Sequence, residues 1–317
     1  MDHIFIADAH CDTLSKMLEE DMLLDASRGD SHPWHISIDK LKKGNVKVQI
    51  FAAWVAGPKH RPFAQQGMKL VDTYHQMLEH PLSPFVHLTK ENIHHVLHTS
   101  EKIGTILSLE GGEALEGEIF NLRNFYRLGV RLLTLTWNHR NEIGDGVSET
   151  QSNGGLSQFG LKVIHEMNRL RMIVDVSHLN YRGFWDVIEH SVLPIMASHS
   201  NAKSIWDHPR NLDNDQINAI IQTKGFIGIN FYPGFLEEKD SDVESIIKHI
   251  DHIVSLGGLE HVGFGSDFDG INETPKGIDG PQDYYRIIEA LSRIGYRDED
   301  IKKISANNLL RYVENFL

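Results

Sequence analysis

The sequence predicts an α/β fold in which eight parallel strands and their helices close into a (β/α)8 TIM barrel. Short apolar runs of β type alternate with amphipathic helical segments along all 317 residues, the pattern of βα units around a parallel sheet. The apolar runs number eight, which is the strand count of this barrel. Residues able to hold a metal ion or move a proton follow five of the eight runs.

A doubly wound open sheet is the competing architecture, because it shows the same alternation of strands and helices. In an open sheet the ligand sits at one switch point that only a few strands serve. Here the candidate residues follow the first, third, fifth, sixth and eighth runs. A closed barrel would bring all of these strand ends to one face, so the dispersal favours the barrel.

The strand-like runs are short and apolar, and polar or glycine-containing segments separate them. We expect strands at residues 4–9, 46–55, 104–109, 130–136, 172–177, 193–198, 226–231 and 261–266. The loops after the fourth and sixth strands, residues 137–156 and 200–212, are long. In a barrel, loops at these positions build the active-site face.

Helical spacing of apolar residues predicts helices over residues 157–170 and 243–255, among others. The tail, residues 298–316, is a further helix with an apolar stripe that includes Ile304 and Leu309. We expect this extra C-terminal helix to pack either on the outside of the barrel or against another subunit. The second arrangement would make the protein a homodimer.

Composition is that of an ordinary globular protein, with 40% hydrophobic and 24% charged residues, and its uniformity predicts one catalytic domain over residues 1–317. The formal net charge of −13 argues against a nucleic-acid partner. A single cysteine, Cys11, excludes an intrachain disulfide and indicates a reducing compartment. Neither a signal pattern, a membrane-spanning stretch nor a lipid-anchor tail is visible, so we expect a cytoplasmic protein without a membrane partner.

His10 and Asp12 follow the first strand, and the two-residue period of a strand places both side chains on the same side. An imidazole and a carboxylate at this spacing suit a divalent cation, and zinc fits them best. Taken alone, the pair also fits a capped strand end. The same period points Cys11 away from the metal, towards the core.

Glu110 follows the third strand and precedes Gly111 and Gly112. A carboxylate at a strand end with small residues beyond it can bridge two cations, one oxygen to each. In isolation, Glu110 fits an ordinary acid at a helix N-terminus equally well.

His178 and His199 end the fifth and sixth strands. One histidine at a strand end is usually a polar residue with no further role. Two on successive strands would place their imidazoles side by side, which is much more specific for a metal site.

Asp267 ends the eighth strand. Beside a metal, this carboxylate can take the proton of a bound water and return it to a leaving amine, acting first as a general base and then as a general acid. Asp269, two residues on, is expected to line the substrate pocket or to cap the turn at Gly270.

In order along nearly the whole chain, these motifs resemble those of the membrane (renal) dipeptidase family of metal-dependent amidohydrolases. Each motif is short, but the series is highly specific. The motifs are Asp8-Ala9-His10-Cys11-Asp12, Glu110-Gly111, Asp175-Val176-Ser177-His178, Ser198-His199-Ser200, His208-Pro209-Arg210-Asn211 and Gly265-Ser266-Asp267-Phe268-Asp269-Gly270. The resemblance implies an amidohydrolase-like barrel that acts as a zinc-dependent dipeptidase, a soluble bacterial-type member of the family.

The resemblance also implies a site with two Zn²⁺ ions. One zinc would be held by His10, Asp12 and Glu110, and the other by Glu110, His178 and His199, with Glu110 bridging them. Asp267 would be the acid and base. Arg210 would bind the terminal carboxylate of the substrate, for which a planar guanidinium is well shaped, and Tyr232 would line the pocket.

The implied reaction is hydrolysis of small dipeptides, of the type L-Xaa-L-Xaa and L-Xaa-D-Xaa, by attack of a zinc-bridging hydroxide on the peptide carbonyl. The chain departs from the family at Trp137, where the membrane enzymes have a histidine that polarises the carbonyl. His139 lies two residues on, and strand parity would point it the same way. We therefore expect Trp137 in the substrate pocket and His139 as the replacement donor.

Two alternatives stay open. The same metal site could act on another small amide or lactone, which Trp137 makes plausible. The chain could also be a metal-binding protein without catalysis, although such a protein would have no need of Asp267. A serine hydrolase is set aside, because the sequence contains no G-x-S-x-G elbow.

Overall fold

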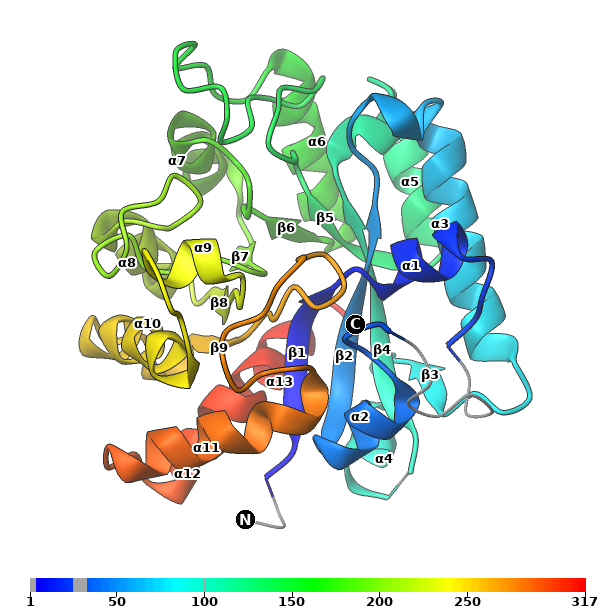
Figure 1. Cartoon of the computed structure of the whole chain (residues 1–317). Coiled ribbons are helices and arrows are strands. Elements are labelled where there is room, and N and C mark those ends of the chain that lie inside the picture. Colours follow the sequence, from blue (N-terminus) through cyan, green and yellow to red (C-terminus); the bar gives the residue numbers. More distant parts are fainter. Residues whose placement is uncertain (1–3, 25–32, 100) are drawn as a thin grey trace.

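The computed structural model describes residues 4–24, 33–99 and 101–317, and its fold is the predicted (β/α)8 barrel (Figure 1). The barrel strands are β1 Ile6–Cys11, β2 Val46–Trp54, β4 Ile103–Glu110, β5 Val130–Thr134, β6 Ile173–Asp175, β7 Met196–Ala197, β8 Phe226–Ile229 and β9 Val262–Phe264. All pair in parallel with their neighbours in the order β2-β1-β9-β8-β7-β6-β5-β4. Pairing of β2 with β4, from Val48 with Gly104 to Trp54 with Glu110, closes the ring.

One strand was not predicted. β3, Phe85–His87, pairs in parallel with the first residues of β4, along the edge that β5 takes over from Leu107 onwards. β3 therefore lies outside the closed ring of eight. Three residues are too few to show an alternating pattern, so the sequence carries no period for this strand.

Helices surround the barrel, and two of them match their predicted ranges closely. The helices are α1 Thr13–Glu19, α2 Ile38–Lys43, α3 Phe63–Glu79, α4 Ile93–His98, α5 Ile119–Arg127, α6 Gln158–Leu170, α7 Tyr181–His190, α8 Asn214–Gln222, α9 Pro233–Leu236, α10 Val243–Ser255, α11 Tyr284–Arg293, α12 Asp298–Lys302 and α13 Asn308–Val313. Ser157 caps α6 by accepting a hydrogen bond from the N–H of Gly160, and Asp242 and Ser245 form a capping box on α10. These caps fix where the two helices begin.

The tail is α12, one π-helical turn over Lys303–Asn307, and α13. Leu309 and Val313 of α13 belong to a buried cluster with Phe226, Met196 and Ile173, which are the first residues of β8, β7 and β6. The tail therefore packs on the N-terminal end of its own barrel, rather than on its side. The homodimer stays a prediction.

A larger apolar cluster fills the layer between the outer face of the strands and the helices. Cys11 belongs to it and is fully buried, as its strand parity predicted. The core thus leaves the C-terminal ends of the strands free for polar residues. Among the described residues, no helix combines the length and the apolar character needed to cross a bilayer.

Candidate metal centre

The polar residues predicted at the strand ends meet over the C-terminal end of the barrel, beside a cleft of about 360 Å³. The cleft residues used below are Asp12, Trp54, Glu110, Trp137, Asn138, His178, Tyr232, Asp267 and Asp269. Parallel strands in a barrel all end at this face, which is why side chains far apart in the sequence come together here.

His10 and Asp12 lie side by side at the end of β1. The Nε2 atom of His10 is 3.3 Å from Oδ2 of Asp12 and 3.3 Å from Oε2 of Glu110, and all three residues are buried. Within the described chain, Oδ1 of Asp12 has no hydrogen-bond partner. A buried carboxylate oxygen without a partner is costly, so this atom is available to a cation.

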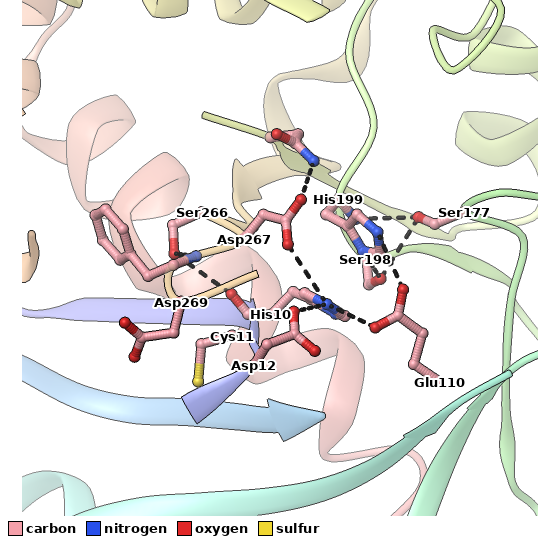
Figure 2. Close-up of polar contacts among 12 residues, drawn as sticks. His10, Cys11, Asp12, Glu110, Ser177, Ser198, His199, Ser266, Asp267 and Asp269 are labelled. Atoms are coloured by element: carbon pink, nitrogen blue, oxygen red, sulfur yellow. Dashed lines mark hydrogen bonds and ion pairs between the residues drawn. The ribbon is translucent and has the colours of Figure 1, made fainter. Parts of the chain in front are cut away.

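Glu110, the last residue of β4, reaches His10 with one carboxylate oxygen and His199 with the other (Figure 2). Its Oε2 atom faces His10, whereas Oε1 lies 3.2 Å from Nε2 of His178 and 3.8 Å from Nε2 of His199. The following Gly111 has a φ of 102°, and a Cβ there would meet the carbonyl oxygen of Val55 at 2.3 Å. Glycine at this turn lets the chain leave the strand immediately after Glu110.

His178 and His199 bring their Nε2 atoms to within 2.8 Å of each other. Nδ1 of His178 lies 2.7 Å from Oδ1 of Asn138, and Nδ1 of His199 lies 2.7 Å from the hydroxyl of Ser198. With the hydrogens on Nδ1, both Nε2 atoms are free to coordinate a cation between them; without a cation, a contact of 2.8 Å needs a hydrogen on one of the two Nε2 atoms. Burial holds the pKa of both imidazoles well below the usual value, which keeps them neutral, the form that binds metals.

The chemistry of the donors fits metal ions. Two groups of three residues could each hold a metal ion, because the ligand atoms within each group lie within 4.8 Å of one another. The groups are His10 with Glu110 and His199, and His10 with Asp12 and Asp267. Burial, reinforced by Glu110, raises the pKa of Asp12 to about 6. Burial acts to lower the pKa of His10, but Glu110 and Asp12 outweigh it and raise that pKa well above its usual value. Acidic groups this close together retain protons because their negative charges repel each other. A cation bound between them can replace those protons.

Asp267 follows β9 and reaches the same centre. Its Oδ1 atom lies 3.9 Å from Nε2 of His10, and its Oδ2 atom accepts a hydrogen bond of 2.8 Å from the side-chain amide of Asn230. The pKa of Asp267 is raised to about 8, mainly by burial; the charges of Asp12 and Glu110 add to this effect and His10 opposes it. A carboxyl group with a raised pKa beside a cleft is suited to proton transfer.

Arg210 is buried, and it lies beside the cleft rather than in it. It lines a neighbouring cavity of about 70 Å³, which shares His178 with the cleft. One guanidinium nitrogen donates to the carbonyl of His199 at 3.2 Å, and Nε has no partner in the part of the chain that the structure describes. Burial lowers the pKa of Arg210 to about 10, so it is charged at neutral pH and still has donors for an anion.

Trp137 lines the cleft. Its ring lies edge-on to Trp54, with 5.3 Å between centroids, and 6.0 Å from the ring of His178. The sequence analysis did not single out Asn138. This residue lines the cleft, and its side chain also contacts Nδ1 of His178.

The structure does not bring His139 to the cleft, which corrects the expectation. Its side chain is 69% exposed, and Nδ1 lies 3.9 Å from Glu149. Strand parity failed here because β5 ends at Thr134, so the chain has already left the strand when it reaches His139.

Tyr232 and Asp269 both line the cleft, but they differ in what they offer it. Tyr232 packs edge-on against Phe235, with 4.8 Å between ring centroids. In contrast, the two carboxylate oxygens of Asp269 are occupied: one accepts from Thr13 and the other from the N–H of His35, each at 2.6 Å. Asp269 therefore ties the loop after β9 to the start of α1 and to residue 35.

Two further buried carboxylates, Asp8 and Asp175, lie directly behind the candidate ligands, and each accepts four hydrogen bonds. The sequence analysis quoted both within motifs but gave them no role. The signal in the sequence was their shared position, since each precedes a candidate ligand histidine by two or three residues.

Comparison with known proteins agrees with this centre. A model of the membrane dipeptidase family, peptidase family M19, matches residues 1–316. An uncharacterized dipeptidase of Schizosaccharomyces pombe is 37% identical over 213 residues, covering 66% of this chain and 52% of that protein, so the match spans about half the length of that relative. An uncharacterized protein of Klebsiella pneumoniae is 34% identical over 223 residues, covering 67% of this chain and 82% of that protein.

Two solved structures match almost end to end. A metallo peptidase from Rhodobacter sphaeroides, liganded with a phosphinate mimic of the dipeptide L-Ala-D-Ala, has a TM-score of 0.90 at 27% identity and covers 99% of both chains. A second metallo peptidase of family M19, a dipeptidase, has a TM-score of 0.88 at 27% identity and also covers 99% of both chains.

Proposed function

The chain belongs to the membrane dipeptidase family, peptidase family M19, and we propose that it is a dipeptidase that works with two zinc ions. The observation that carries this proposal is the position of Glu110. Its two oxygens face different buried histidines, His10 on one side and His178 with His199 on the other. A carboxylate so placed can serve two cations at once.

Five residues would hold the metal ions. The ligands would be His10, Asp12 and Glu110 for the first zinc, and Glu110, His178 and His199 for the second. Zinc bound there would supply a Lewis acid for the peptide carbonyl and would lower the pKa of water towards about 7. The neutral imidazoles and the unpartnered oxygen of Asp12 support this assignment.

Asp267 would be the acid and base. Its Oδ1 atom lies on the side of His10, while Asn230 holds Oδ2, so the carboxyl group is fixed with one oxygen available to the cleft. From this position it would take a proton from the attacking water and pass it to the departing amine, which keeps the proton count balanced across the hydrolysis.

Arg210 would bind the carboxylate at the C-terminal end of the substrate. The guanidinium is charged, buried and bonded to protein at one nitrogen, and its Nε atom lacks a partner among residues 4–24, 33–99 and 101–317. A carboxylate can satisfy two donors of such a group at once. Because Arg210 stands beside His178, this carboxylate would lie next to the second zinc position.

The aromatic residues of the cleft would contact the substrate side chains. Trp54 and Trp137 form one wall, and Tyr232 belongs to the lining as well. We propose dipeptides of the type L-Xaa-L-Xaa and L-Xaa-D-Xaa as substrates. The second type is supported by the Rhodobacter sphaeroides relative, whose ligand mimics L-Ala-D-Ala.

A second candidate is hydrolysis of another small amide or lactone by the same centre. The position of Trp137 favours it, because a large indole occupies the cleft beside His178.

The single buried cysteine suits a reducing compartment, and we retain the cytoplasm as the proposed location.

Metal analysis of the purified chain, followed by a panel of L-L, L-D and D-L dipeptides with and without a chelator, tests the proposal. We expect zinc in stoichiometric amount and turnover that the chelator abolishes. Zinc without turnover of any dipeptide would favour the second candidate. Protein that neither contains nor takes up zinc would contradict both.

A further inference from the structure

Two buried aspartates behind the metal centre make the same set of contacts. Oδ1 of Asp8 accepts the backbone N–H of His10 at 3.2 Å and that of Ser266 at 2.9 Å, while Oδ2 accepts the hydroxyls of Ser266 at 2.6 Å and Tyr284 at 2.7 Å. Each oxygen therefore accepts two hydrogen bonds. Together they join β1 to the segment that follows β9.

Asp175 repeats this arrangement in the other half of the barrel. Its Oδ1 atom accepts the backbone N–H groups of Ser177 at 3.1 Å and Ser198 at 2.9 Å, and Oδ2 accepts the hydroxyls of Ser198 and Thr134, both at 2.6 Å. These contacts join the ends of β5, β6 and β7.

In both cases one serine donates its N–H and its hydroxyl to the aspartate, and this serine directly precedes a residue of the centre. Ser266 precedes Asp267, and Ser198 precedes His199 (Figure 2). The chain that carries the aspartate supplies the other member, His10 or His178. Each aspartate thus fixes the separation of two functional side chains that come from adjacent strands.

Asp175 has an additional effect on His199, through the hydroxyl of Ser198. The hydroxyl of Ser198 has a single hydrogen, and it donates this hydrogen to Asp175. The oxygen of Ser198 must then accept from Nδ1 of His199, 2.7 Å away. The hydrogen of His199 is therefore held on Nδ1, and Nε2 keeps the lone pair that faces Glu110.

We propose that Asp8 and Asp175 are paired positioning residues, one for each half of the metal centre, and that Asp175 also sets the tautomer of His199 through Ser198. The metal-binding part rests on the proposed function. The tautomer part does not, because it concerns the protein without metal.

The matched variants Ser198→Ala and Thr134→Val test the tautomer. Each removes one hydroxyl from the same oxygen of Asp175 at the same distance, but only Ser198 contacts His199. Nitrogen NMR of the ¹⁵N-histidine-labelled, metal-free full chain reports which ring nitrogen carries the hydrogen. The His199 signals are those lost in His199→Gln.

We expect the hydrogen on Nδ1 of His199 in the wild type and in Thr134→Val, and a shift towards Nε2 in Ser198→Ala. Ser198→Thr, which keeps a hydroxyl, should restore the wild-type state. An unchanged tautomer in Ser198→Ala would overturn the proposal. An equal change in Thr134→Val would also overturn it, because it would indicate general loosening.

Zinc titration of the same metal-free proteins tests the division between the halves. Loss of partners behind a metal ligand commonly lowers metal affinity about 10- to 100-fold. We expect Asp175→Asn and Ser198→Ala to weaken the binding step that His199→Gln removes, and Asp8→Asn to weaken the other step. Equal weakening of both steps by both aspartate variants, or none by either, would contradict the paired roles.

If the aspartate variants do not fold, Ser266→Ala and Ser198→Ala provide the same comparison. A chain that binds no zinc would refute the proposed function while leaving the tautomer result valid.

Discussion

Asn230 donates its side-chain amide to Asp267, with 2.8 Å between Nδ2 and Oδ2, and thereby leaves Oδ1 of Asp267 on the side of His10. This contact fixes the one carboxyl group of the centre that the proposed function does not assign to zinc. Residues proposed for metal binding and the residue proposed for proton transfer thus lie side by side, with 3.9 Å between Nε2 of His10 and Oδ1 of Asp267.

Asp267→Asn should lower kcat by about 100- to 10,000-fold, because an amide cannot take and return a proton as a carboxyl group does. Zinc content should stay at the wild-type level, since the five proposed ligands remain. Dipeptide turnover and elemental analysis on the same sample check this. Near-full turnover with zinc bound would show that Asp267 is not the acid and base.

Trp137→Ala should reduce kcat/KM for dipeptides with an aromatic side chain, by up to about tenfold relative to Ala-Ala. The variant removes the indole that packs against Trp54 in the cleft, and an aromatic contact contributes roughly 0.5–1.5 kcal/mol. The ratio of kcat/KM for the two substrates is the measurement. An unchanged ratio would indicate that the substrate side chains do not reach the wall formed by Trp54 and Trp137.

His139→Ala is the natural companion variant, because His139 neighbours Trp137 in the sequence but is 69% exposed and lies outside the cleft. We expect kcat and KM to match the wild type on both substrates. A fall in kcat of the size expected for Asp267→Asn would instead restore His139 as the carbonyl donor that the sequence suggested.

His249 should make the stability of the protein depend on pH. Its Nε2 atom lies 2.9 Å from the carbonyl of Leu236 and its Nδ1 accepts from the N–H of Ala202 at 3.1 Å, in a fully buried site. Burial lowers the pKa of His249 to about 4. The unfolded chain takes up a proton at His249 below about pH 6.5, whereas the folded chain does so only near pH 4.

The contribution of His249 is therefore complete above pH 6.5 and is lost as the pH falls from there towards 4. At pH 5 the loss should be about 2 kcal/mol in the free energy of unfolding. Urea unfolding at pH 7.5 and pH 5 should show a loss larger by this amount in the wild type than in His249→Gln. The exposed His165→Gln is the control and should behave like the wild type; equal losses in all three would contradict the prediction.

The sequence was sufficient for the barrel because its strands are apolar and its helices amphipathic, patterns that do not depend on distant contacts. The sequence analysis did not predict β3, because a strand of three residues is too short to show an alternating pattern. The packing of the tail on the N-terminal end of the barrel also depends on distant partners such as Phe226, so the stripe alone left two arrangements open.

For the centre, the sequence was most informative where a residue lies within or directly after a strand. His10, Asp12 and Glu110 come together as the parity and the strand ends suggested. His139 does not, because it lies in a loop whose course no period describes. Asn138 acts through a contact 40 residues away, with His178, which only the folded chain reveals.

The central claim is that Glu110 serves two zinc ions, and zinc content per chain in Glu110→Gln tests it most directly. The matched control is Glu113→Gln, three residues on, whose carboxylate bonds to Asn141 instead of facing the histidines. We predict about two zinc ions per chain in the wild type and in Glu113→Gln, and loss of zinc from both positions in Glu110→Gln. Retention of both ions by Glu110→Gln, or loss of only one, would contradict the bridging role.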